Sequence, residues 1–141
     1  MISPKDHFRY NNKTFKSTES SCGSYNIIYL VYCSICNKLY IGRSTRPLRI
    51  RIGEHRRNFY HILDNKPYST DNDDFILGSH LYDHGFRDKS DFNKIYRTCV
   101  LEICSPSVLD IKEHKYVHLT NSMIPNGLNL SNPLSIPLLY S

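Results

Sequence analysis

Two short apolar runs rich in Tyr, Ile and Val limit the possible folds of this chain more than any other feature. They cover residues 26–33 and 39–42 and are separated by the turn SICNK. β-Branched and aromatic residues favour strands, and so short a connection favours an antiparallel hairpin. With a two-residue loop at the start of the turn, Tyr29 would lie opposite Tyr40 on one face. A longer turn would shift this register by a residue or two.

Helical periodicity follows the hairpin. Apolar positions recur at spacings of four and three, which predicts a helix that opens at Arg46 or Pro47 and ends near residues 64–67. A second helix is expected over residues 75–83, closed by Gly85. The stripe of the first helix consists of Leu48, Ile52, His55, Phe59 and Ile62.

A third strand and a last helix complete the expected fold. Residues 93–103 form the strand, which is apolar on both faces at its end and is therefore predicted to be central in the sheet. Residues 105–107 cap a helix that runs to about residue 121. The order β-β-α-α-β-α predicts an α+β fold, in which a small antiparallel three-stranded β-sheet is flanked by helices.

The 141 residues suffice for one compact domain. We expect residues 1–22 to be a polar N-terminal arm or linker remnant and residues 23–141 to be the domain, ending in a Pro- and Leu-rich tail. No apolar run is long enough to span a bilayer, and the N-terminus has no secretory signal. Five Cys without an export signal favour an intracellular location, nuclear or cytoplasmic, over a disulfide framework.

Positive charge is concentrated in one segment. Residues 43–57 hold six arginines and one acid, Glu54, so this segment carries the whole formal net charge of +5. A basic stripe on an otherwise neutral domain predicts a polyanion partner, although a solvated helix face is the alternative. Arginine rather than lysine favours phosphate groups as the bound anions, and the arginines expected to contact them are Arg43, Arg46, Arg49, Arg56 and Arg57.

Two polar residues interrupt apolar stripes. His55 takes a core position one turn after Arg51, and Glu113 lies on the inner face of the last helix. His55 could be a satisfied core histidine, and Glu113 could form a salt bridge with an arginine. The alternative is an active site in which Arg51 binds phosphate, His55 or a tyrosine moves a proton, and Glu113 holds Mg²⁺ or Mn²⁺.

The same residues resemble the signature of the GIY-YIG endonuclease family. Residues 27–29 (IIY) and 40–42 (YIG) are followed in order by Arg51 and His55, the segment KEHKYV and the segment PNGLN. The resemblance covers residues 22–133. It implies hydrolysis of DNA phosphodiesters with one metal ion, leaving a 5′-phosphate and a 3′-hydroxyl. The chain departs from the family signature at two positions: Ile27, where the first triplet usually has glycine, and Tyr116, where tryptophan is usual.

The resemblance also assigns roles to individual residues. Tyr29 would be the general base or its relay, with His55 assisting, and Tyr40 would position water or phosphate. Arg51 would stabilise the pentavalent phosphate, Glu113 would hold the metal ion, and Asn129 would brace the site.

Cysteines in the hairpin suggest a sub-group. The chain resembles the endonuclease domain of Penelope-like retroelements, in which hairpin Cys and downstream His form a zinc site. We expect Zn²⁺ on Cys33, Cys36 and His80, with Cys22 or His84 as the fourth ligand. Unliganded thiols are the alternative, and His84 could instead match a general family feature before the third strand.

The sequence thus predicts a nicking or double-strand endonuclease, either free-standing or part of a mobile element. A fused or associated reverse transcriptase or DNA-targeting domain, and a homodimer, are the expected partners; a membrane is not. The alternatives are a catalytically inactive, zinc-stabilised nucleic-acid-binding module and a regulatory zinc protein.

Overall fold

The computed structural model describes residues 7–10, 13–16 and 23–130. Its main sheet has three strands: β3 (Ile27–Cys33), β4 (Leu39–Ser44) and β5 (Tyr96–Ile103). The helices are α1 (Leu48–Leu63), α2 (Ile76–Asp83), α3 (Asp91–Ile95) and α4 (Leu109–Thr120), with short helical turns η2 (Asp73–Phe75) and η3 (Pro106–Val108). The α+β fold with a three-stranded antiparallel sheet flanked by helices is confirmed.

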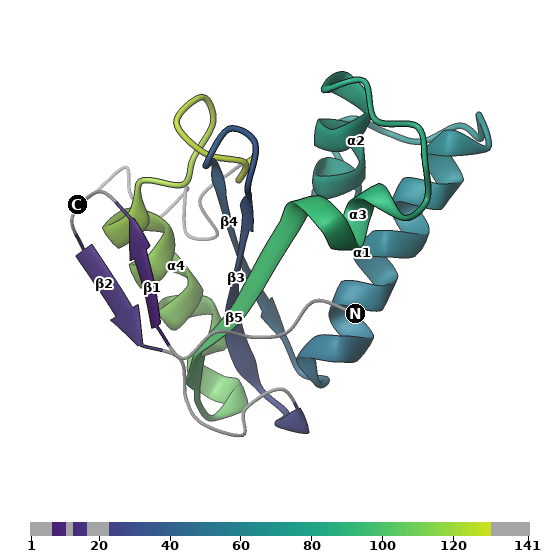
Figure 1. Ribbon diagram of the computed structural model, residues 1–141. Coiled ribbons are helices and arrows are strands. Elements are labelled where there is room, and N and C mark those ends of the chain that lie inside the picture. The colour runs from purple at the N-terminus through teal and green to yellow at the C-terminus, as the bar shows by residue number, and fades with distance from the viewer. Residues whose placement is uncertain (1–6, 11–12, 17–22, 131–141) are drawn as a thin grey trace.

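Helices cover both faces of the sheet (Figure 1). On one face, Tyr29, Val31 and Tyr40 pack against α1, α2 and α3. On the other face, Ile28 and Leu30 pack with residues of α4. The side chains alternate between the faces because successive residues of a strand point in opposite directions. Within the described residues, no helix is long and apolar enough to cross a membrane.

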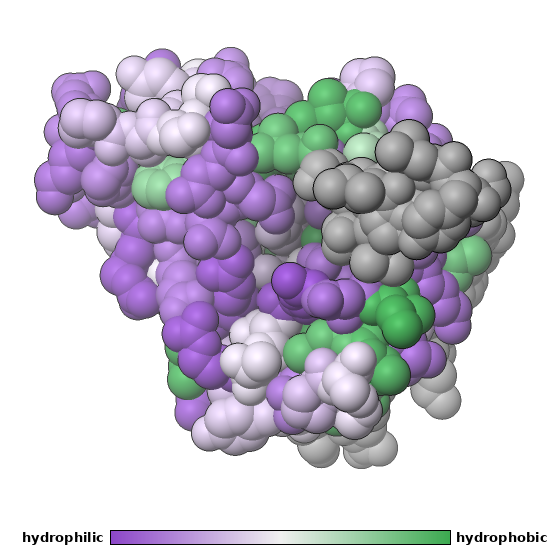
Figure 2. Space-filling view, turned by 180° about the vertical axis from the view of Figure 1, so that it is seen from behind, coloured by the Kyte–Doolittle hydropathy of each residue, from purple (hydrophilic) through white to green (hydrophobic). Residues whose placement is uncertain are grey.

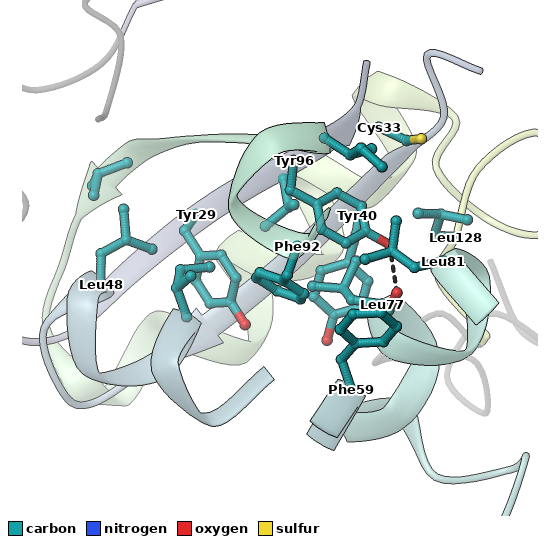
Figure 3. Close-up of a cluster of buried hydrophobic side chains, with 14 of the residues drawn as sticks. Tyr29, Cys33, Tyr40, Leu48, Phe59, Leu77, Leu81, Phe92, Tyr96 and Leu128 are labelled. Atoms are coloured by element: carbon teal, nitrogen blue, oxygen red, sulfur yellow. Dashed lines mark hydrogen bonds between the residues drawn. The ribbon is translucent and has the colours of Figure 1, made fainter. Parts of the chain in front are cut away.

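The larger core contains the fully buried tyrosines of β3, β4 and β5, Tyr29, Tyr40 and Tyr96 (Figure 3). Tyr29 and Tyr40 lie on this face, and Phe59 and Phe92 are both fully buried there. The hydroxyl of Tyr96 donates to the carbonyl of Leu77 at 2.5 Å, so this buried tyrosine ties β5 to α2.

The hairpin register differs from the prediction based on a two-residue loop. Tyr29 pairs with Gly42, and Tyr40 pairs with Val31. The turn is longer, because the Cys33 amide donates to the Lys38 carbonyl at 3.0 Å. A shift of two residues preserves the face, so the rings of Tyr29 and Tyr40 remain neighbours, with centroids 6.3 Å apart.

The prediction of a central third strand is wrong. The strand order is β4-β3-β5, so β5 lies at an edge of this sheet. It is apolar on both faces because helices cover both: Val100 belongs to the core beside α1, and Leu101 to the core beside α4. The strand also begins later than expected, since residues 91–95 form α3.

A second difference concerns the N-terminal arm. Strands β1 (His7–Tyr10) and β2 (Lys13–Lys16) form a separate two-stranded antiparallel sheet. The sequence signal was the Asn-Asn pair between two short runs that contain aromatic residues. The division at residue 22 stays a prediction.

The glycine of the YIG triplet is required by packing. A Cβ on Gly42 would lie 2.7 Å from Cε1 of Tyr29 and closer still to its Cζ and hydroxyl. We expect Gly42→Ala to lower the free energy of unfolding by about 1–3 kcal/mol, because the core must move. Urea denaturation measures this. In the control Gly53→Ala the new methyl meets only arginine ends, at 3.6 Å, and an equal loss in both variants would contradict the prediction.

The glycine missing from the first triplet has no comparable role here. Ile27 is fully buried in the same core as Tyr29. Its side chain therefore fills space that a glycine would leave empty, and the departure from the signature is compatible with the fold.

Candidate functional site

A pocket of about 290 Å³ opens beside β4. It collects side chains from distant parts of the chain, brought together by the sheet, two helices, η2 and the segment after α4. Its lining residues are Tyr40, Arg43, Arg51, Asp73, Asp74, Glu113 and Asn129. Four of the six predicted catalytic residues thus meet here: Tyr40, Arg51, Glu113 and Asn129.

Glu113 is the buried carboxylate of this pocket. The residue is 8% exposed, on the face of α4 that also buries Val117. Burial raises its pKa to about 7, the charge of Asp73 adds to the rise, and Arg43 and Arg51 oppose it. The Nε of Arg43 lies 3.8 Å from Oε1 of Glu113. The expected salt bridge is therefore present, but it does not offset the cost of burying the charge.

Arginines in the pocket are held by carboxylates. Arg51 donates to Glu54 at 2.9 Å and also to Asp74, and its side chain is 16% exposed. Arg43 pairs with Asp110. A carboxylate and a phosphate offer similar paired oxygens to a guanidinium. A phosphate in the pocket could therefore take the place of a carboxylate partner of either arginine.

Tyr29 and His55 lie behind the pocket rather than in its lining. Both are fully buried, and the Tyr29 hydroxyl lies 2.8 Å from Nε2 of His55. On the other side of the ring, Nδ1 of His55 lies 3.4 Å from the Asp74 carbonyl. Burial and the positive charge of Arg51 lower the pKa of His55 to about 3, so the imidazole is neutral at pH 7.

The lowered pKa of His55 makes stability depend on pH. Between its unfolded pKa, about 6.5, and its folded pKa, about 3, the unfolded chain binds a proton that the folded protein does not. The free energy of unfolding therefore falls on acidification, by up to about 1.4 kcal/mol per pH unit from this group. We expect His55→Gln to flatten this part of the profile, measured by urea denaturation. Glu113 titrates in both proteins, so its contribution cancels when the two plots of unfolding free energy against pH are compared. If the two plots are parallel, His55 is not the source of the pH dependence.

Asn129 braces the pocket from the segment after α4. Its amide exchanges two hydrogen bonds with the backbone of Ile41, Oδ1 accepting at 2.9 Å and Nδ2 donating at 2.8 Å. The Ser122 hydroxyl donates to the same Oδ1 at 2.7 Å. The side chain is thus held in one orientation, as expected for a residue that positions a wall of the site.

Asp73 and Asp74 are pocket residues that the sequence analysis missed. Asn72 caps η2, its side chain accepting from the Asp74 amide at 3.0 Å. This turn directs Asp73 to the Tyr40 hydroxyl, which donates at 2.8 Å, while Asp74 meets Arg51. The available signal was the acidic cluster DNDD at residues 71–74, just before the predicted second helix.

The remaining arginines predicted to bind DNA lie on or beside α1. Arg46, Arg49 and Arg57 are exposed, and Arg56 is half-buried and donates to Asn93 at 3.4 Å. Arg46 is paired with Glu54. Seen from behind, the side of the molecule that carries α1 is largely hydrophilic (Figure 2).

The predicted metal ligands of the hairpin turn and α2 converge. The ligand atoms of Cys33, Cys36, His80 and His84 all lie within 4.8 Å of one another, and these four residues could hold a metal ion such as zinc. Sγ of Cys36 is 3.3 Å from Nε2 of His80, which is 3.2 Å from Nε2 of His84. Tetrahedral zinc, with bonds of about 2.0–2.3 Å, places its ligand atoms about 3.3–3.8 Å apart.

These distances are compatible with His84 as the fourth ligand. The alternative ligand, Cys22, lies outside the described residues. In the described part of the chain, Cys33, Cys36, Cys99 and Cys104 are not joined by disulfide bonds.

The fold is similar to that of the catalytic domain of intron endonuclease I-TevI. A mutant form of that domain has a TM-score of 0.52 and 19% sequence identity, with 76% of this chain and 94% of that chain covered. The chain therefore has a GIY-YIG-like fold. A second structure, the catalytic domain of homing endonuclease I-TevI, gives a TM-score of 0.48 and 18% identity over 75% of this chain and 98% of that chain. Neither a family model nor a curated protein sequence matches the chain.

Proposed function

We propose that this protein is a metal-dependent DNA endonuclease that hydrolyses phosphodiester bonds and leaves a 5′-phosphate and a 3′-hydroxyl. The main support is the pocket, which brings Tyr40, Arg51, Glu113 and Asn129 together although they come from four separate segments. The I-TevI domain with the same fold is itself described as an endonuclease catalytic domain. An arginine that binds the phosphate, a tyrosine or histidine that moves a proton and a glutamate that holds a metal ion suffice for phosphodiester hydrolysis.

Each residue has a proposed role in this reaction. Arg51 stabilises the additional negative charge of the pentavalent phosphate, and it exchanges a carboxylate partner for the phosphate when substrate binds. Tyr29 and His55 act as a proton relay, in which Tyr29 accepts a proton from water and passes its own to neutral His55. Because both are buried, this relay requires the covering Asp74 segment to move.

The proposed catalytic metal ion is Mg²⁺ or Mn²⁺, held by Glu113. The pocket fits such an ion, because Glu113 supplies the carboxylate oxygens that hard cations prefer, and water and substrate phosphate can supply the other ligands. Burial also leaves the Glu113 carboxylate with a pKa raised to about 7, and a cation would favour its charged form. When bound, the ion would act as a Lewis acid on the phosphate oxygens.

We further propose that Cys33, Cys36, His80 and His84 hold a structural zinc ion. Two ligands come from the β3–β4 turn and two from the C-terminal end of α2, so the ion would join the hairpin to the helical layer. This site, together with the resemblance described above, supports a mobile-element origin. A reverse transcriptase or DNA-targeting partner, and a homodimer, belong to the same proposal.

A plasmid cleavage assay tests the proposed function. Purified protein is incubated with supercoiled plasmid and Mg²⁺ or Mn²⁺, beside the Arg51→Ala variant, and the ends of the products are analysed. We expect nicked or linear DNA from the wild type and none from the variant. DNA binding without cleavage would instead support the inactive, zinc-stabilised binding module.

Exposed arginines of α1 should give salt-sensitive DNA binding. We expect Arg49→Ala and Arg57→Ala each to weaken binding to any DNA sequence and to reduce the slope of log K against log salt by about 1. Fluorescence anisotropy at several salt concentrations measures this slope. Lys115→Ala, exposed on α4 across the sheet, is the control; an equal effect there would contradict a DNA-binding role for α1.

A further inference from the structure

The proposed roles leave Asp73 and its contact with Tyr40 unexplained. Tyr40 is 2% exposed, and its hydroxyl donates a hydrogen bond of 2.8 Å to Oδ2 of Asp73. Both residues line the pocket. Asp73 also accepts a hydrogen bond from the backbone of Leu130, next to Asn129. The carboxylate is therefore fixed between β4 and the segment after α4.

The direction of this hydrogen bond determines what Tyr40 can bind. An ionised carboxylate has no proton to donate, so the single proton of the phenol must point toward Asp73. Burial raises the pKa of Tyr40 well above its usual value, so the phenol keeps that proton at neutral pH. The remaining lone pairs of the phenol oxygen can only accept hydrogen bonds.

The direction of this hydrogen bond excludes phosphate as a partner of the Tyr40 hydroxyl and leaves water. A bridging or non-bridging phosphate oxygen is itself an acceptor and cannot bond to a hydroxyl whose proton is already used. A water molecule has two protons and can donate one of them to the phenol oxygen. The charged Asp73 strengthens that acceptor, because hydrogen bonds in a chain polarise one another.

We propose that Asp73 is a positioning residue that holds the Tyr40 hydroxyl as a hydrogen-bond acceptor, so that Tyr40 binds the attacking water and not the scissile phosphate. This inference rests on the proposed nuclease function for its catalytic consequence. The hydrogen bond and its effect on ligand choice can be tested without cleavage.

Cleavage kinetics test the catalytic consequence. We expect Asp73→Ala to reduce kcat at least about 10-fold with KM for DNA changed less than about two-fold, because it removes a group that acts on water. Asp73→Asn, which keeps an acceptor oxygen, should restore part of the loss. The exposed Asp71 lies in the same loop, and Asp71→Ala is the matched control with unchanged kcat.

A double-mutant cycle separates positioning from a general structural effect. If Asp73 acts through Tyr40, Asp73→Ala should cause no further loss in the Tyr40→Phe background. An equal loss in both backgrounds would overturn the inference. The inference would also be overturned if Asp73→Ala reduced Mn²⁺ binding as strongly as Glu113→Ala does, because Asp73 would then be a metal ligand.

Two measurements do not depend on cleavage and so distinguish this inference from the proposed function. In protein labelled with ¹³Cζ-tyrosine, one of the 11 tyrosine signals is assigned to Tyr40 by Tyr40→Phe. We expect Asp73→Ala to shift this signal and Asp71→Ala to leave it in place.

The second measurement is DNA affinity in the presence of Ca²⁺. This affinity should change less than two-fold in Tyr40→Phe and fall in Arg51→Ala.

These measurements decide the inference whether or not the protein cuts DNA. Absence of cleavage by the wild type would refute the proposed function. An unmoved Tyr40 signal, or a Tyr40→Phe variant that binds DNA as weakly as Arg51→Ala, would refute the role of Asp73.

Discussion

Glu113→Gln is expected to reduce cleavage by about 10²- to 10³-fold, the loss typical of removing a group that stabilises charge in the transition state. Glutamine preserves the shape of the side chain and removes the negative charge that would hold the metal ion. The folded protein should tolerate this change well. Glu113 is 8% exposed and burial raises its pKa to about 7, so neutralising it removes a cost of folding.

The experiment therefore combines a rate with a melting temperature. Single-turnover cleavage of a supercoiled plasmid gives the rate, and calorimetry should give an unchanged or higher Tm. Asp110→Asn is the matched control, because Asp110 lies on the same helix and pairs with the same Arg43. Asp110 is 62% exposed. If Glu113→Gln cleaves within 10-fold of the wild type, Glu113 does not hold the catalytic metal ion.

Zinc removal should have the largest effect on stability. A tightly bound structural ion stabilises the folded state by about 4 kcal/mol or more, which corresponds to about 10 °C or more in Tm for a domain of this size. We expect the purified protein to contain about one zinc ion per chain. Both chelation and Cys36→Ser should remove the ion and lower Tm by that amount, as measured by calorimetry and metal analysis.

The matched control is Cys104→Ser. Cys104 is a half-buried thiol at the exit of β5, outside the group of four possible ligands. Its replacement should leave both the zinc content and the response to chelator unchanged. Wild-type protein without zinc, or a Tm that chelator does not alter, would refute the structural metal site and favour unliganded thiols.

Sequence patterns predicted the helices well, because helix periodicity and helix ends depend on interactions between residues close in the sequence. The stripe of α1, the αL residue Gly85 after α2 and the serine-proline start of the last helix all involve neighbours within a few positions. The unusual residues in those patterns were equally informative. His55 and Glu113 were singled out because each replaces an apolar residue, and both are buried as that reasoning required.

Properties that depend on distant segments could not be predicted in the same way. Strand order was misjudged because burial on both faces of β5 reflects two layers of helices, which strand periodicity alone cannot distinguish from a central position. Asp73 was overlooked because its importance comes from Tyr40, which is 33 positions away. That His84 belongs to the possible metal group likewise needed the distances between side chains.

The hydrogen bonds between Asn129 and Ile41 have a consequence for solubility. β4 forms one edge of the three-stranded sheet, and an open edge can recruit a strand from another molecule. The Leu128 amide donates to the Leu39 carbonyl at 2.8 Å, and the Asn129 amide satisfies both backbone groups of Ile41.

Together these two residues occupy outward-facing backbone groups of Leu39 and Ile41, so this part of the edge is not open to another strand. A chain cut just after α4 would keep every helix and strand of the main fold but expose this edge. Such a fragment should aggregate by sheet extension, so the segment that places Asn129 in the pocket also prevents molecules from associating through this edge.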